Sequence, residues 1–171
     1  MLAYLKNERE GARMLLTAFK GKYNTSKMLL DGAHGDQIHK LLLTNSFAAC
    51  EREIREAIAA CRPKYVISFG QKPLVDRLCI EPVACCQGDV ICSSFDISLL
   101  EASLTAYGIP YIISETPSNY LCNHAYYHGL RYIAENKMDT KMIFIHVPGR
   151  KNFRNMDAVV AWLHDFCRDR L

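Results

Sequence analysis

Tyr65-Val66-Ile67-Ser68-Phe69-Gly70 is the stretch that decides the fold. It is short, apolar and rich in β-branched and aromatic residues, as is typical of a strand in the interior of a sheet. The segment before it places apolar residues at helical spacing from Phe47 to Cys61, with charged residues on the opposite face, and Pro63 closes this helix. A helix that leads directly into a buried strand indicates an α/β protein.

The same alternation continues on both sides of this stretch. Strands are predicted at 14–19, 40–44, 78–86, 111–114 and 142–146, and helices at 26–30, 97–107, around Cys122 and at 156–167. Ser26 is the expected cap of the first of these helices. The pattern predicts a three-layer α/β/α sandwich around a mostly parallel, twisted sheet.

Four segments are expected to meet at one edge of this sheet. In a parallel sheet, ligand sites gather at the carboxyl ends of the strands. The residues at or just past such ends are Phe19, Gln71, the loop before Cys122, and His146. The edge that they share is therefore the expected functional site.

Length and composition predict one domain over residues 1–171, with residues 1–12 as a candidate N-terminal extension. The net charge of +3 is small, and no basic run alternates with aromatic residues, so no nucleic-acid partner is expected. No apolar stretch approaches the ~20 residues of a membrane span. Acidic residues stand where a secretory signal has its apolar core, so we expect no secretory signal and no membrane association.

The eight cysteines are expected to be free thiols. They lie on the apolar faces of predicted helices or in apolar extended segments, where cysteine behaves as a small hydrophobic residue. No C-x-x-C pair is present, so neither a zinc knuckle nor a redox pair is indicated. A reducing, cytoplasmic location is the prediction.

Cys122 differs from the other cysteines by its position. Thr116-Pro117-Ser118-Asn119 supplies capping residues, which places Cys122 in the first turn of a helix. There the helix dipole is expected to favour the nucleophilic thiolate, and free backbone N–H groups could receive an oxyanion. The alternative is one more buried, apolar cysteine.

His146 and Glu81 are the expected partners of this cysteine. His146 ends an apolar strand, and Pro148 turns the chain immediately afterwards, so its imidazole is expected at the rim. Glu81 stands within the apolar run Cys79-Ile80-Glu81-Pro82-Val83. It is either the solvent-facing member of an alternating strand or the acid that orients His146. His146, in turn, is either a structural residue or the general base.

His124 and His128 share a helix face at the i, i+4 spacing of metal ligands. The Glu that follows the first His in zinc peptidases is replaced by Ala125, and no third ligand is apparent nearby. The sequence therefore predicts no metal site.

Five segments together resemble the pyroglutamyl-peptidase I (pyrrolidone-carboxylate peptidase) family of cysteine peptidases, from about Met14 to Pro148. These segments are Leu15–Phe19, Pro63–Gln71, Arg77–Ala84, Tyr120-Leu121-Cys122-Asn123 and Phe144-Ile145-His146-Val147-Pro148. The resemblance implies a phosphorylase/hydrolase-like fold and a Cys122–His146–Glu81 triad without metal or cofactor. It implies a peptide or small amide substrate with a blocked N-terminus, bound by Phe19, Gln71 and, with weaker support, Asn24. It also implies a homo-oligomer.

The chain departs from the family pattern around the substrate pocket. The turn after Phe19 lacks the second aromatic residue of the family, and the longer family segment after Cys86 is reduced to Gln87–Cys92. The alternative to an exopeptidase is therefore a divergent, non-catalytic relative that uses the scaffold for binding or assembly. A nucleoside-phosphorylase-like activity is disfavoured, because no phosphate-binding Gly-rich loop is present.

Overall fold

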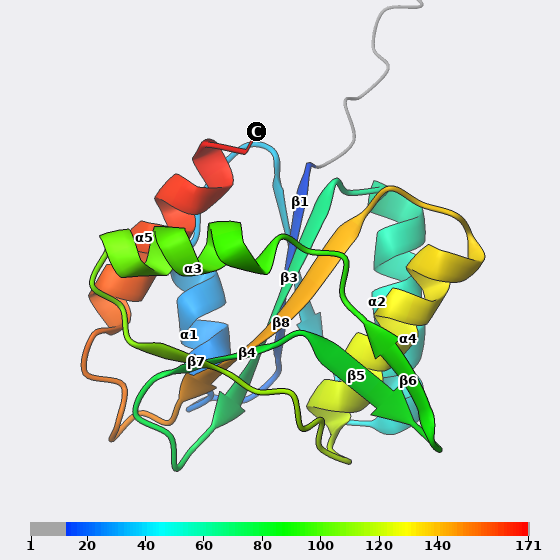
Figure 1. Cartoon of the computed structure of the whole chain (residues 1–171), viewed down its shortest axis with the longest axis horizontal. Helices are drawn as coiled ribbons and strands as arrows, with labels where there is room; N and C mark the ends of the chain where they lie inside the picture. The colour runs from blue at the N-terminus through cyan, green and yellow to red at the C-terminus, as the bar shows by residue number, and fades with distance from the viewer. Residues whose placement is uncertain (1–12, 171) are drawn as a thin grey trace, which may run out of the picture.

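A six-stranded sheet in the order β2-β1-β3-β8-β4-β7 forms the centre of the computed structural model, which describes residues 13–170 (Figure 1). Its neighbouring strands are parallel, except for the antiparallel pair β4–β8. The predicted N-terminal extension, 1–12, lies outside the described residues. The strands are β1 (Met14–Phe19), β2 (Ile38–Leu43), β3 (Tyr65–Lys72), β4 (Leu78–Glu81), β7 (Tyr111–Ile113) and β8 (Lys141–Pro148).

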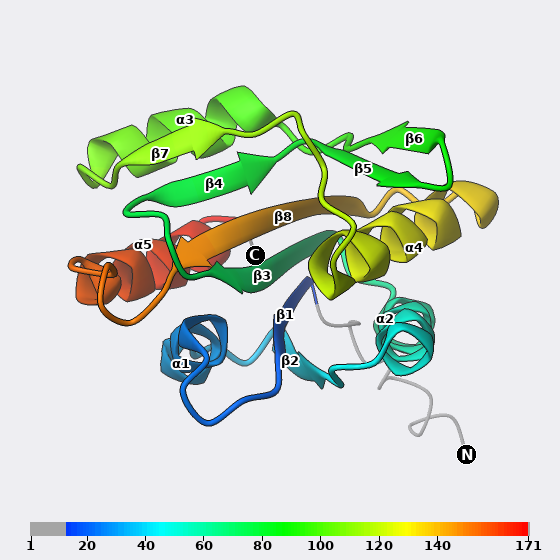
Figure 2. The same cartoon turned by 90° about the horizontal axis from the view of Figure 1, so that it is seen from below.

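Helices cover both faces of the sheet, which confirms the predicted three layers (Figure 2). One face packs against α1 (Thr25–Gly32), α3 (Ile97–Ala106) and α5 (Met156–Arg168). The other packs against α2 (Phe47–Cys61) and α4 (Leu121–Glu135). None of the helices within residues 13–170 is long and apolar enough to cross a membrane.

The start of α1 corrects one expectation. Asn24, not Ser26, caps this helix: its Oδ1 accepts hydrogen bonds from Ser26 N at 3.0 Å and from Ser26 Oγ at 2.6 Å. Ser26 is buried in the first turn, where its hydroxyl donates to the cap. Asparagine and serine both cap helices well, and the helix begins directly after Asn24 rather than after Ser26 because the Asn24 side chain satisfies the free Ser26 N–H.

The extended segment 78–86 is two strands rather than one. β4 belongs to the large sheet, whereas β5 (Val83–Cys86) pairs with β6 (Asp89–Cys92) in a separate antiparallel hairpin. Pro82 stands between β4 and β5, and because proline has no N–H group it cannot continue a ladder. The hairpin lies along α4 (Figure 2), where the side chain of Asn123 bonds the backbone N–H and C=O of Cys85 at 3.0 and 2.6 Å.

Strand register places the expected catalytic residues on one face of the sheet. Cys79 lies opposite His146 in the antiparallel β4–β8 pair. Because alternate residues share a face, Glu81 lies on the same face as His146 and diagonally across from it. Gly70 of β3 is the parallel partner of His146 and shares this face too. It is the face that α2 and α4 cover.

Gly70 leaves room for the α4 cysteine. A Cβ atom added at Gly70 would lie 2.7 Å from Cys122 Sγ and 2.8 Å from Phe144 Cζ. Real Cβ atoms do not approach other atoms so closely, so the sulfur occupies the space above the glycine backbone. Only glycine, which has no side chain, allows the start of α4 to pack this closely on β3.

Gly70→Ala is therefore expected to lower the free energy of unfolding by about 1–3 kcal/mol, because the new methyl group overpacks a rigid site. Urea unfolding followed by circular dichroism measures this. Gly129→Ala is the matched control, since its methyl group would meet the flexible end of Met142, with Sδ at 2.6 Å. Alanine also favours helix at that position. A Gly70→Ala protein as stable as the control would refute the close packing of Cys122 on β3.

Candidate active site

The buried pair His146–Glu81 is the firmest contact of the site. His146 Nδ1 lies 2.7 Å from Glu81 Oε1, and the two residues are 8% and 5% exposed. A charged residue is seldom buried without a partner, and here the partner is the imidazole. Glu81 is therefore not the solvent-facing residue of an alternating strand. Its carboxylate fixes the ring orientation and favours the tautomer with the proton on Nδ1, which leaves Nε2 as an acceptor.

Cys122 is the second residue of α4 and lies on the same face of the sheet. Its sulfur sits over Gly70, the register partner of His146. Neighbouring strands are about 4.8 Å apart, so the sulfur lies over the strand next to the one that carries His146. No hydrogen bond joins the Cys122 thiol to His146 in the part of the chain that the structure describes. The structure thus brings the three predicted residues together without closing the contact between sulfur and imidazole.

The prediction of a stabilised thiolate is wrong for this conformation. Burial, followed by the negative charge of Glu81, raises the pKa of the Cys122 thiol to about 12. The sulfur is therefore a neutral thiol at pH 7. The backbone N–H at the helix start lowers this pKa, as expected, but by less than burial raises it.

The start of α4 presents backbone donors beside the sulfur. The cap residue is Tyr120, whose side chain makes no capping bond, so the predicted caps among 116–119 are not used. The first intrahelical bond runs from His124 N to Tyr120 O at 3.1 Å. The N–H groups of Leu121, Cys122 and Asn123 precede it and point out of the helix end, as the first N–H groups of any helix do. They are suitable donors to an oxyanion.

An open groove of about 440 Å³ lies next to Cys122. All three predicted substrate-binding residues line it: Phe19 as a nearly buried wall, Asn24 and Gln71. Gln71 Oε1 accepts from Thr25 N at 2.8 Å and from Thr25 Oγ1 at 3.1 Å. Within residues 13–170, the side chain of Gln71 makes hydrogen bonds through its carbonyl oxygen alone, so its amide Nε2 remains available to a ligand.

Two aromatic residues of the groove were missed in the sequence. Phe47 and Tyr120 line the groove and are 50% and 76% exposed. Phe47 fits the apolar repeat of α2, so its sequence position indicated core rather than surface. Tyr120 is the cap residue of α4, a position where exposure has no sequence signal. Together they supply exposed aromatic surface to the groove.

His146 and Glu81 border a separate, much smaller hollow. Its volume is about 10 Å³, roughly that of one water molecule. The Tyr126 hydroxyl also borders it and has no hydrogen-bond partner among the residues described. The histidine is therefore screened from bulk solvent, whereas the cysteine opens to the groove.

Comparison with known proteins places the chain in a family. The sequence profile of pyroglutamyl peptidase matches residues 90–153, a span that contains Cys122 and His146. A pyrrolidone-carboxylate peptidase of Clostridium perfringens is 30% identical over 145 residues, which cover 71% of this chain and 68% of that protein. This chain belongs to the pyroglutamyl peptidase family. A relative of the same name from Thermosipho melanesiensis is 29% identical over 153 residues, covering 76% of this chain and 75% of that protein.

Solved structures agree on the fold. A mutant pyrrolidone carboxyl peptidase from Pyrococcus furiosus superposes with a TM-score of 0.79 at 19% identity, covering 92% of this chain and 96% of that one. Pyroglutamyl peptidase I from Bacillus amyloliquefaciens gives a TM-score of 0.75 at 22% identity, covering 88% and 92%. The α/β fold of this family is thus retained in residues 13–170.

Alkylation of Cys122 tests the state of its thiol. With a pKa of about 12, its thiolate fraction rises tenfold for each pH unit across the neutral range. The rate of reaction with iodoacetamide at Cys122 should therefore rise about tenfold per unit between about pH 6 and 9. Peptide mapping by mass spectrometry measures this rate for each cysteine. Exposed Cys92 is the internal control and should react faster throughout. A Cys122 rate that is constant from mildly acidic pH upwards would show a preformed thiolate instead.

Proposed function

We propose that this chain is a cysteine exopeptidase that removes an N-terminal pyroglutamyl group, or a similar small acyl group, from peptides. One observation carries the proposal: Cys122 Sγ lies over the register partner of His146, and His146 is bonded to Glu81 at 2.7 Å. Nucleophile, base and orienting acid thus share one face in the order that acyl transfer requires. Membership of the pyroglutamyl peptidase family supports the assignment.

The first half-reaction transfers the acyl group to sulfur. Cys122 Sγ forms a bond to the scissile carbonyl carbon while its thiol proton passes to His146 Nε2. The oxyanion is received by the N–H groups at the start of α4. The C–N bond then breaks, and His146 returns the proton to the departing amine. Because the resting thiol is neutral, His146 acts as a general base during attack rather than as the cation of a preformed ion pair.

The second half-reaction is hydrolysis of the thioester. A water molecule gives one proton to His146 Nε2 and adds its oxygen to the same carbonyl carbon. The C–S bond breaks, and the proton on His146 restores the Cys122 thiol. The Glu81 carboxylate stabilises the imidazolium that forms in both steps. The bond from the Cys122 thiol to His146 Nε2 would form when substrate binds, because catalytic hydrogen bonds are often long in the free enzyme and shorten in the substrate complex.

The groove beside Cys122 fits a small acyl group. Its volume of about 440 Å³ lies within the usual range for small-ligand sites. Phe19 would form an apolar wall against a small ring, and Gln71 Nε2 would donate to a ring carbonyl. Exposed Phe47 and Tyr120 would replace the aromatic residue that the turn after Phe19 lacks. Asn24 is a weaker contact, because its Oδ1 is occupied by Ser26.

A non-catalytic relative is the second candidate. Two observations favour it: the raised pKa of Cys122, and the lack of a bond from its thiol to His146 within residues 13–170. Such a protein would use the groove to bind a blocked N-terminus without cleaving it. Turnover distinguishes the two candidates.

The test is hydrolysis of a pyroglutamyl-coumarin amide by the purified, reduced protein. We expect release of the coumarin by wild type and a loss of kcat/KM of at least about 1,000-fold in Cys122→Ser, because serine at this position lacks the acidity of a thiol. Cys92→Ser is the matched control and should keep wild-type activity, since Cys92 is exposed on β6, away from the groove.

Absence of turnover by wild-type protein, with other small N-terminal acyl groups tested in parallel, would refute the peptidase proposal. It would leave the binding protein as the better account. Turnover that persists in Cys122→Ser would refute the assigned nucleophile.

A further inference from the structure

A second group of reactive side chains lies on the other side of α4. His124 and His128, one helical turn apart, meet Cys86 at the end of β5. One ligand atom from each of the three lies within 4.8 Å of the others. The sequence indicated no third ligand for the two histidines. Cys86 was missed because it is far away along the chain and reaches α4 only when the hairpin docks.

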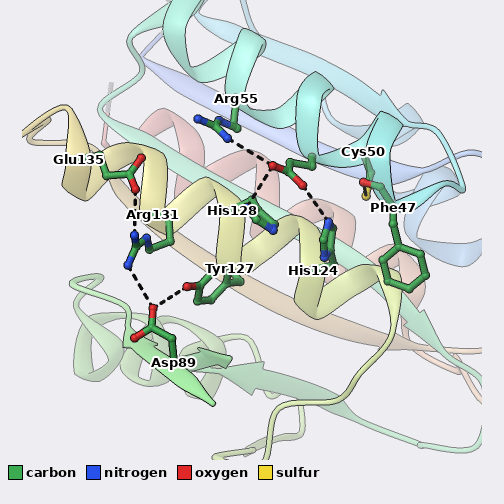
Figure 3. Close-up of polar contacts among 10 residues, drawn as sticks. Phe47, Cys50, Arg55, Asp89, His124, Tyr127, His128, Arg131 and Glu135 are labelled. Carbon is green, nitrogen blue, oxygen red and sulfur yellow. Dashed lines mark hydrogen bonds and ion pairs between the residues drawn. The ribbon is translucent and has the colours of Figure 1, made fainter. Parts of the chain in front are cut away.

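A carboxylate holds both histidines in place (Figure 3). Glu51 of α2 places Oε2 at 3.2 Å from His124 Nε2 and Oε1 at 3.4 Å from His128 Nδ1. One nitrogen of each ring is thus engaged, and the other has no hydrogen-bond partner among residues 13–170. A carboxylate behind a ligating histidine fixes the ring and makes it a stronger ligand. Arg55, 3.3 Å from Glu51 Oε1, favours this supporting role over direct coordination by Glu51.

We propose that Cys86, His124 and His128 bind a divalent metal ion of the zinc class, with Glu51 as the supporting carboxylate. A thiolate and two imidazoles are a donor set that suits Zn²⁺ and excludes hard cations such as Mg²⁺ and Ca²⁺. Binding releases the Cys86 thiol proton to solvent, because the thiolate is the ligand. Water completes a tetrahedral site, since the three residues are only partly buried.

The metal would join the β5–β6 hairpin to α4 and, through Glu51, to α2, the two helices that contribute residues to the groove. Cys86 belongs to the β5–β6 hairpin, the histidines to α4, and Glu51 to α2. Phe47, which lines the groove, packs edge-on against His124 with ring centroids 5.0 Å apart. A bound ion would therefore fix the hairpin on α4 and hold the His124 ring beneath the groove aromatic. This site is separate from Cys122, which lies against β3.

Cobalt binding tests the site without reference to peptidase activity. Co²⁺ added to the reduced, metal-free protein should produce a thiolate-to-cobalt charge-transfer band in the near ultraviolet. The band should saturate at about one ion per chain and disappear when Zn²⁺ is added. Cys86→Ser should abolish the band, and His128→Asn should weaken binding by about tenfold or more.

Two matched controls identify the thiolate. Cys92→Ser, on the same hairpin, and Cys122→Ser, on the same helix, should both keep the band. If Cys86→Ser fails to fold, as judged by circular dichroism, His128→Asn alone decides the question. The proposal is refuted if the wild-type protein gives no cobalt band, or if the band survives both Cys86→Ser and His128→Asn. It is also refuted if the band is lost in Cys122→Ser and kept in Cys86→Ser. The last result would place the metal on the proposed nucleophile.

Discussion

The contact between Glu81 and His146 is the constraint on which the site depends. A buried carboxylate that loses its partner costs about 3–5 kcal/mol, so the two side chains hold each other in place. They meet because β4 runs antiparallel to β8, the one such pair in the large sheet of residues 13–170, and this register sets them diagonally on one face. Pro82 then ends β4 directly after Glu81, and the chain leaves for the hairpin that docks on α4. One strand therefore supplies the acid and directs the hairpin to its place.

Gly70 imposes the matching constraint from the neighbouring strand. Its lack of a side chain lets the Cys122 sulfur pack over β3 beside Phe144. The same close packing buries the thiol and raises its pKa to about 12. The packing that would position Cys122 as a nucleophile thus also keeps its thiol protonated, so in the proposed mechanism His146 removes the proton when a substrate binds. The same packing contact thus places the Cys122 thiol over β3 and lowers the fraction of it that is ionised.

The sequence predicted the layers of the fold better than the contacts within the candidate site. Apolar runs and helical spacing were sufficient for the three layers, and strand ends located Phe19 and Gln71 at one edge, where both line the groove. His146 was expected at the rim, but it is buried within β8 beside Glu81, because the strand continues to Pro148. Register was not predictable: the antiparallel pairing of β4, the break at Pro82 and the docking of Cys86 on α4 depend on tertiary packing. The pKa of the Cys122 thiol depends on whether burial outweighs the helix start, and the extent of burial is set by tertiary packing that the local sequence does not encode. The family resemblance implied the proposed triad, and the strand register explains why Glu81 and His146 meet and why Cys122 lies over the strand beside them.

The most direct test of this account is the mass of the Cys122 peptide after the protein is mixed with a pyroglutamyl thioester and quenched in acid. The account predicts a pyroglutamyl group on Cys122, formed about 100-fold more slowly in Glu81→Gln because the imidazole loses its orienting charge. His146→Ala should slow it at least as much. Acylation of a different cysteine, or acylation of Cys122 at the same rate in all three proteins, would contradict the claim that Cys122 acts with the His146–Glu81 pair.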